Sequence, residues 1–261
     1  MSRADGRRAD QLRPVRIRPN FVRTADGSCL IELGETRVIC TATIQRGVPR
    51  FLEGTQRGWI TGEYGMLPAS TSERKQRGRN DGRAVEIQRL IGRALRAVAR
   101  LERLTGLTCT VDCDVLQADG GTRCAAVTGG YVALALALWK RRKDLPRGQP
   151  KAGPTTRRAH RAWPLVDVAA ATSVGLVDGR ALLDLDYQED SSAEVDMNVV
   201  MTAAGRLIEV QASGEGHTFD DKSLARLLAL ARKGCQVLLA AQRRALPKSL
   251  PWPPARQHKE V

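Results

Sequence analysis

Four consecutive residues, Gly120 to Arg123 with the sequence GGTR, have the properties of an anion-binding site. They follow a run rich in β-formers, residues 107–116, and precede an apolar segment, residues 125–139, which is too long for a strand and predicts a buried helix. Gly120 and Gly121 permit backbone conformations closed to other residues, and the first turn of a helix carries unpaired N–H groups with partial positive charge. Thr122 and Arg123 add a hydroxyl and a guanidinium. We predict a phosphate site here, the alternative being a glycine turn with a surface arginine.

A second arginine is expected at the start of another helix. From Asp81, which can serve as N-cap, apolar residues recur with the 3.6-residue period of an amphipathic helix. Arg83 falls in its first turn, where a cation opposes the helix dipole at a cost of up to about 1 kcal/mol. A nearby anion would remove that penalty. If the two helix starts converge, Arg83 and Arg123 would hold the same phosphate.

Six carboxylates lie within thirteen residues, between Asp184 and Asp196. Asp184 and Asp186 are expected on one face of a strand, while Asp190 and Asp196 would face each other across a turn at 191–194. Crowded carboxylates favour a counter-ion, and hard oxygen ligands beside a phosphate suit Mg²⁺ or Mn²⁺. For the two glutamates of the cluster, Glu189 and Glu194, we expect only solvation of a turn.

The charge balance favours a polyanion as partner. The net charge is +14, and two segments, 140–164 and 243–261, together carry +12 of it. A basic excess of this size promotes nucleic-acid binding through counterion release, although a merely soluble basic surface is the alternative. The region 45–82 is predicted as a long irregular loop, in which Arg74 and Arg77 are suited to hold a phosphate backbone, a solvated charge run being the other interpretation.

The remaining composition predicts a cytoplasmic globular protein. Six cysteines lie mostly in apolar runs without a CxxC pair, so reduced, buried thiols are expected and a zinc site is not. The first residues lack the apolar core of a signal peptide, and the apolar run 132–139 is too short to cross a bilayer, so no membrane contact is expected.

The elements that must position these groups belong to a mixed α/β fold. Strands are predicted at 15–18, 29–33, 36–44, 166–177, 181–187, 195–201 and 206–211, with a tight hairpin at Gly34 and Glu35. A second amphipathic helix is predicted over 219–245, capped by Asp220 or Asp221. We predict a single domain over 1–246, with 140–164 as an exposed basic insertion loop. The tail, 247–261, contains Pro and Trp and is expected to be unstructured or an accessory arm.

Four stretches of the chain together resemble bacterial ribonuclease PH. They are WITGEYGMLP, GRAVEIQRLIGRALRAV, CDVLQADGGTR and EDSSAEVDMNVVM, which occur in the family's order, and the similarity runs from about Arg13 to about Ala245, interrupted by the basic insertion. The resemblance implies a ribonuclease PH-type βαβα domain, with mixed sheets packed by helices, that assembles as a homohexameric ring, a trimer of dimers. The implied activity is phosphorolytic 3′–5′ exoribonuclease, or tRNA nucleotidyltransferase, which trims tRNA precursors with inorganic phosphate as co-substrate.

The resemblance also assigns roles to particular residues. It implies that phosphate is bound by Arg83, Gly121, Thr122 and Arg123, and that Asp190 and Asp196 are the catalytic acids and the ligands of Mg²⁺ or Mn²⁺. Arg74 and Arg77 match arginines of the family that contact RNA, whereas Ala69 stands where the family usually has another arginine. Cys124 replaces a Thr or Ala of similar size. Two other functions remain open on the sequence: a non-catalytic RNA-binding ring subunit, and a metal-dependent hydrolytic exonuclease.

Overall fold

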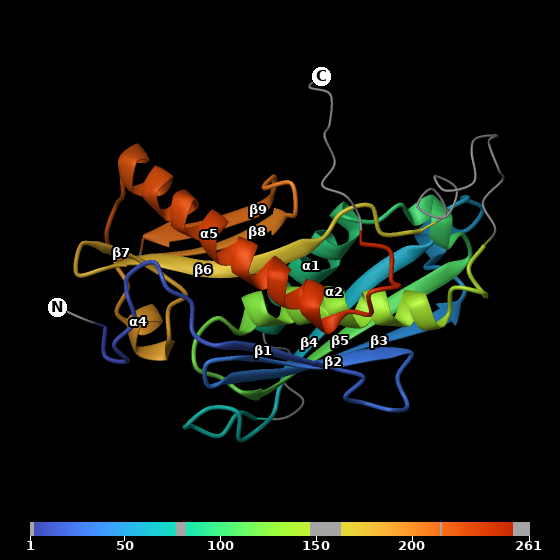
Figure 1. Cartoon of the computed structure of the whole chain (residues 1–261), viewed down its shortest axis with the longest axis horizontal. Helices are drawn as coiled ribbons and strands as arrows, with labels where there is room; N and C mark the ends of the chain where they lie inside the picture. The colour runs from blue at the N-terminus through green and yellow to red at the C-terminus, as the bar shows by residue number, and fades with distance from the viewer. Residues whose placement is uncertain (1–2, 77–81, 147–162, 215, 253–261) are drawn as a thin grey trace.

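The computed structural model of the chain describes residues 3–76, 82–146, 163–214 and 216–252, and these residues form two β-sheets with a helix between them. The first sheet has the strand order β1-β2-β3-β5-β4, and the second has the order β7-β6-β8-β9. Helix α2 contacts strands of both sheets, so it forms the middle layer, as Figure 1 shows. The mixed α/β fold predicted from the sequence is confirmed.

Strands of the first sheet follow the alternation of apolar residues. They are β1 (Val15–Pro19), β2 (Gly27–Leu33), β3 (Thr36–Arg46), β4 (Trp59–Met66) and β5 (Leu107–Gln117). In β3 the even-numbered residues from Thr36 to Ile44 are buried and the odd-numbered residues between them are not, which is the period of a strand with one face in the core. The predicted hairpin at Gly34 and Glu35 joins β2 to β3.

Strand β4 corrects the sequence-based prediction, which treated residues 45–82 as one irregular loop. β4 pairs in parallel with β5 at the edge of the sheet and is covered by helix α1 (Gly82–Ala97). The glycines of β4 interrupt the alternation of apolar residues that would indicate a strand. Packing against α1 explains why one of them, Gly62, must be a glycine. A Cβ on Gly62 would lie 2.7 Å from the Ile91 side chain of α1, so a larger residue would push the helix off the strand.

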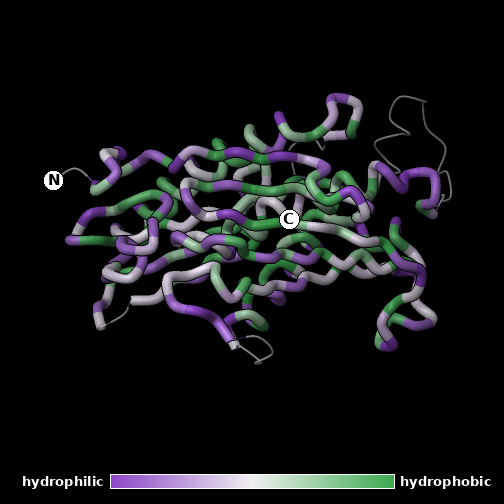
Figure 2. Tube along the Cα trace, turned by 90° about the horizontal axis from the view of Figure 1, so that it is seen from below, coloured by the Kyte–Doolittle hydropathy of each residue, from purple (hydrophilic) through white to green (hydrophobic). Residues whose placement is uncertain are grey.

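Helix α2 (Thr122–Lys140) is buried along nearly all of its length, and 89% of its apolar stretch lies inside the protein. By length and composition it could cross a membrane, but here its side chains fill the core between the sheets. The apolar segment at 125–139 is therefore a core helix, as predicted. Figure 2 shows hydrophobic residues running through the middle of the molecule, with polar residues concentrated in the loops at its ends.

The second sheet contains β6 (Ala169–Val177), β7 (Arg180–Leu183), β8 (Val195–Thr202) and β9 (Leu207–Gly214), all antiparallel. Helix α5 (Asp221–Ala245) packs on β6 and β7, and its N-cap is Asp220, whose Oδ1 accepts a hydrogen bond of 2.8 Å from the Ser223 amide. One of the two caps proposed from the sequence is thus confirmed. The other predicted cap, Asp81 of α1, lies outside the described residues.

Two other expectations need correction. β7 ends at Leu183, so Asp184 and Asp186 do not share a strand face; a short helix, α4 (Tyr187–Ser191), follows instead, with Asp186 as its N-cap. The first part of the C-terminal tail, 247–252, is not an extended arm. Leu250 is buried there, and the Trp252 ring meets Tyr131 edge to face with 6.4 Å between ring centroids. The rest of the tail and most of the basic insertion lie outside the described residues.

Candidate active site

The glycine turn between β5 and α2 has the conformation that the sequence predicted. Gly120 and Gly121 have φ angles of +69° and +67°, the left-handed region that glycine adopts without strain, and Gly121 is the N-cap of α2. Among the described residues no side chain caps this helix start, so its first-turn N–H groups are available to a ligand. Thr122 Oγ1 accepts a hydrogen bond of 2.9 Å from the Tyr64 hydroxyl, which leaves the Thr122 hydrogen free to donate.

Arg123 lies on the first turn of α2 and is held by two other elements. Its Nη1 donates to Gln211 Oε1 of β9 at 2.7 Å and lies 3.8 Å from Glu86 Oε1 of α1. Gln211 in turn donates to Glu86. The starts of α1 and α2 are thus tied together through β9. Arg83, in the first turn of α1, lines the same pocket as Arg123, so the two predicted helix starts do converge.

The two candidate acids reach this pocket from α4 and from the strand that follows it, β8. Asp190 lies on α4, whose capping box holds it in place: Asp186 Oδ1 accepts from the Glu189 amide at 2.9 Å and Glu189 Oε2 accepts from the Asp186 amide at 3.2 Å. Glu189 therefore has a structural role that the sequence analysis did not assign to it. Asp196 is the second residue of β8, the strand that follows α4 after a short connection.

Burial raises the pKa of Asp190 above its ordinary value. The nearby guanidinium groups of Arg83, Arg123 and Arg13 oppose this shift, and the negative charge of Asp186 adds to it. The carboxyl group therefore retains a proton at higher pH than an exposed aspartate does, although it lies among arginines. A carboxyl group with a raised pKa, next to a positively charged site that can bind an anion, is typical of sites that carry out acid–base chemistry.

The pocket itself has a volume of about 310 Å³. Six residues singled out from the sequence line it together: Arg83, Gly121, Thr122, Arg123, Asp190 and Asp196. A phosphate held by the arginines and the start of α2 would lie beside two carboxylates. The geometry thus suits a reaction in which phosphate is a reactant, with positioning and charge stabilisation as the main contributions of the protein.

Several lining residues were not found from the sequence. Tyr187, Ser191, Ala193, Asn198 and Ser213 also face the pocket. Asn198 is buried at its edge, and its Nδ2 donates to Asp196 Oδ1 at 3.3 Å. Tyr187 is 62% exposed, on the first turn of α4, and its amide donates to Asp119 Oδ1 at 3.2 Å. The motif EDSSAEVDMN carries Asn198 two residues after Asp196, a spacing that places both on one face of a strand and could have indicated it.

Of the two residues predicted to contact RNA, only Arg74 lies within the described part of the chain. Arg74 is exposed on the segment after β4 and does not line the pocket. Arg77 lies outside the described residues. The six cysteines are free and buried, as predicted. Within the described part of the chain, no group of three or more His, Cys, Asp or Glu side chains is arranged to hold a metal ion.

Comparison with known proteins matches both halves of the chain to one family. Residues 11–139 match the model of domain 1 of the 3′ exoribonuclease family, and residues 167–234 match the model of domain 2. The first model contains the first sheet, α1 and most of α2, and the second contains the second sheet and the first half of α5. The pocket lies between the two matched parts, with its arginines in one and its aspartates in the other.

Solved structures share the fold at low sequence identity. A subunit of the Archaeoglobus fulgidus exosome, with RNA bound to the active site, superposes with a TM-score of 0.75 at 24% identity and covers 92% of each chain. A chain of an archaeal exosome core gives 0.73 at 23% identity, covering 94% of this chain and 91% of that one. Rice (Oryza sativa) Rrp46 gives 0.69 at 22% identity, covering 93% and 95%.

Proposed function

Because the chain belongs to the 3′ exoribonuclease family, we propose that it is a phosphorolytic 3′–5′ exoribonuclease that trims the 3′ ends of tRNA precursors. One observation carries the proposal: two arginines and a free helix start face two aspartates across one pocket. An exoribonuclease that used water would need no cationic site for free phosphate.

In the proposed reaction an oxygen of inorganic phosphate attacks the phosphorus of the last phosphodiester bond. The bond from that phosphorus to the 3′-oxygen of the preceding nucleotide breaks, which releases a nucleoside diphosphate and an RNA one nucleotide shorter. Arg83, Arg123 and the N–H groups at the start of α2 would orient the attacking phosphate and share its charge. The same steps in reverse add nucleotides.

Asp190 and Asp196 are the proposed catalytic pair. The raised pKa of Asp190 supports a role in passing a proton to the leaving 3′-oxygen, since a carboxyl group that binds a proton more readily is a better general acid. When both are ionised, the two carboxylates would hold Mg²⁺ or Mn²⁺, for which one or two protein carboxylates suffice beside water and phosphate oxygens. When bound, the cation would neutralise charge on the transferred phosphate.

We further propose that the protein acts in the cytoplasm as a homohexamer, a trimer of dimers. The similarity to exosome subunits supports a ring, and the net charge of +14 supports an RNA partner. Arg74, Arg77 and the basic segments 140–164 and 243–261 are the proposed contacts to the body of the tRNA. A non-catalytic RNA-binding subunit is the second candidate, but the presence of both arginines and both aspartates in one pocket favours catalysis.

The test is the identity of the released nucleotide. Purified protein is incubated with Mg²⁺ and a tRNA that has a labelled 3′ extension, with and without inorganic phosphate. We expect nucleoside diphosphate only when phosphate is present, and none from Arg123→Ala or Asp196→Asn. Nucleoside monophosphate in both reactions would indicate hydrolysis instead. RNA that is bound but intact would indicate a binding subunit.

A further inference from the structure

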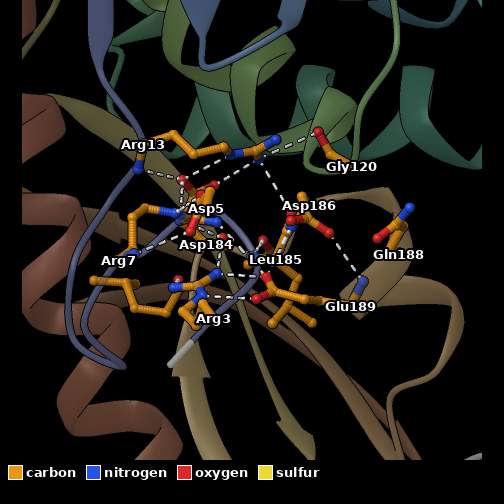
Figure 3. Close-up of polar contacts among 12 residues, drawn as sticks. Arg3, Asp5, Arg7, Arg13, Gly120, Asp184, Leu185, Asp186, Gln188 and Glu189 are labelled. Atoms are coloured by element: carbon orange, nitrogen blue, oxygen red, sulfur yellow. Dashed lines mark hydrogen bonds and ion pairs between the residues drawn. The ribbon is translucent and has the colours of Figure 1, made fainter. Parts of the chain in front are cut away.

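A buried arginine near the start of the chain joins the two halves of the pocket. Arg13 is 4% exposed and pairs with Asp184, which is fully buried. The Arg13 amide and Nε donate to Asp184 Oδ2 at 2.8 and 3.0 Å, and Nη2 donates to Oδ1 at 2.7 Å. Two of these hydrogen bonds come from the guanidinium and fix its orientation against the carboxylate, as Figure 3 shows.

The same guanidinium also contacts the glycine turn of the phosphate site. Arg13 Nη1 donates to the carbonyl oxygen of Asp119, and Nη2 lies 3.4 Å from that of Gly120. Nη2 donates in addition to the carbonyl oxygen of Leu185, at 3.1 Å. One side chain thus binds the turn that leads into α2 and the segment that leads into α4.

These two segments are themselves in close contact. A Cβ on Gly120 would lie 2.5 Å from the Leu185 carbonyl oxygen and 2.7 Å from the Asp186 carbonyl carbon, so only glycine allows the approach. Arg123 is three residues beyond Gly120, and Asp190 is five residues beyond Leu185. The distance between the phosphate site and the catalytic acid therefore depends on the contact between the glycine turn and the segment that leads into α4.

We propose that Arg13 is a positioning residue, which sets the separation between bound phosphate and Asp190 by holding Asp119 and Gly120 against Asp184 and Leu185. The inference rests on the proposed phosphorolytic function. It extends the active site to an N-terminal segment whose described residues do not line the pocket. In their described contacts, Arg3 and Arg7 bind the segment that leads into α4 but not the glycine turn. Arg3 donates to the Leu183 and Asp184 carbonyl oxygens at 2.8 Å, and Arg7 donates to that of Asp184 at 2.9 Å.

The main alternative is that Arg13 only stabilises the fold, and Arg13→Lys separates the two roles. A lysine ammonium can pair with Asp184, but as a compact point charge it cannot also span the carbonyl groups on both sides as the planar guanidinium does. Arg13→Ala would leave the buried, charged Asp184 with only the 3.4 Å ion pair to Arg7, and is expected to unfold. A double variant, Arg13→Met with Asp184→Asn, removes both charges and provides a second folded test.

The following are measured for these variants, for the wild type and for Arg18→Ala: the melting temperature, the Kd for inorganic phosphate by calorimetry without RNA, the Kd for a single-stranded RNA, and kcat and KM for phosphorolysis. Arg18 is a suitable control because it lies on the neighbouring strand β1, is 45% exposed, and pairs with Glu32 at 3.4 Å, away from the pocket. For Arg13→Lys we expect folding with a kcat lower by roughly 10- to 100-fold, as for a displacement of reacting groups by about 1 Å. The Kd for a single-stranded RNA should stay within about twofold, and Arg18→Ala should behave like the wild type in phosphate binding and kcat.

The outcomes separate this inference from the proposed function. If Arg13→Lys and the double variant fold and keep wild-type kcat and phosphate affinity, Arg13 is not a positioning residue. If activity falls only in proportion to the folded fraction, its role is structural and the inference is wrong. A wild type that binds phosphate but releases no nucleoside diphosphate would instead contradict the proposed function, and the phosphate Kd of the variants would still report on the glycine turn.

Discussion

Asn198 and Asp196 form a hydrogen-bonded pair at the edge of the pocket, in which the carboxamide nitrogen lies 3.3 Å from one carboxylate oxygen and 3.5 Å from the other. The carboxamide oxygen accepts a hydrogen bond of 3.3 Å from the Cys124 thiol. Burial raises the pKa of this thiol well above its ordinary value, so it stays protonated and can donate. Cys124 thereby selects the orientation of Asn198 that presents its NH₂ group to Asp196.

This pairing predicts the effect of substitutions at Cys124 and Asn198. Asn198→Ala should lower kcat by about tenfold or more, because Asp196 loses a hydrogen-bond donor that helps to orient it. Cys124→Ser keeps a donor of similar size and should retain most activity, whereas Cys124→Ala removes the donor and should lie between Cys124→Ser and Asn198→Ala. Steady-state kinetics with saturating phosphate check the order. Equal activity in Cys124→Ser and Cys124→Ala would contradict a role for the Cys124 thiol in orienting Asn198.

Glu86 is expected to compete with phosphate for Arg123. It is about half exposed, and its carboxylate lies 3.8 Å from the guanidinium, so its attraction is that of a surface ion pair, about 1 kcal/mol at most. Glu86→Gln should therefore lower the KM for phosphate by up to about fivefold. Glu102→Gln is a matched control, because Glu102 is an exposed carboxylate paired with Arg57 at 3.3 Å, outside the pocket. Similar changes in both variants would indicate a general effect of net charge.

The two glycines of the turn differ in the space around them. Gly120→Ala combines a positive φ with a backbone clash, since the atoms that its Cβ would meet belong to Leu185 and Asp186. It should lower the free energy of unfolding by about 2 kcal/mol or more. Gly121→Ala also has a positive φ, but its nearest neighbour is the end of the Arg13 side chain at 3.2 Å, so a loss of about 1–2 kcal/mol is expected. Urea unfolding of both variants measures the difference, and a larger loss for Gly121→Ala would contradict the described packing.

Glu189 makes stability depend on pH in the acidic range. Burial alone would raise its pKa, but the hydrogen bonds from Arg3 and from the Asp186 amide, with the charges of Arg3 and Arg7, hold it below the ordinary value of 4.5. A carboxyl group whose pKa is depressed in the folded state stabilises the protein above its unfolded pKa and loses that contribution as pH falls through the folded pKa. The stabilisation from Glu189 should thus be complete at pH 7 and decline below pH 4.5.

Glu189→Gln tests this dependence by urea unfolding at pH 7 and at pH 4. The variant should be less stable than the wild type at pH 7, and the difference should shrink at pH 4. Glu35→Gln is the control. The Glu35 side chain is 67% exposed and pairs with Arg37 two residues away. A stability difference between Glu189→Gln and wild type that does not change with pH would contradict a role for the ionised carboxylate.

The parts of the site that follow from local sequence were predictable. The left-handed glycines and the helix starts at Arg83 and Arg123 depend on residues within a few positions of one another. Periodicity identified α1 and α5, and the length of an apolar run identified α2. Contacts between distant residues were not predictable in the same way. Arg13 and Asp184 are 171 positions apart, and no spacing in the chain indicates that they pair. Strand β4 was missed because Gly62 and Gly65 interrupt its apolar pattern, although Gly62 is required by the approach of α1.

The pairing of Arg13 with Asp184 has a consequence for folding during synthesis on the ribosome. A ribosome synthesises the N-terminal arginines first and their partners Asp184 and Glu189 much later, after the strands of the first sheet and α2. Contacts of such large sequence separation form slowly, because a long loop must close before they stabilise the chain. A nascent chain that has folded its first sheet therefore already contains the proposed phosphate-binding sequence, but it lacks the aspartates and the Arg13–Asp184 pair. The proposed activity requires the second sheet to have emerged and docked.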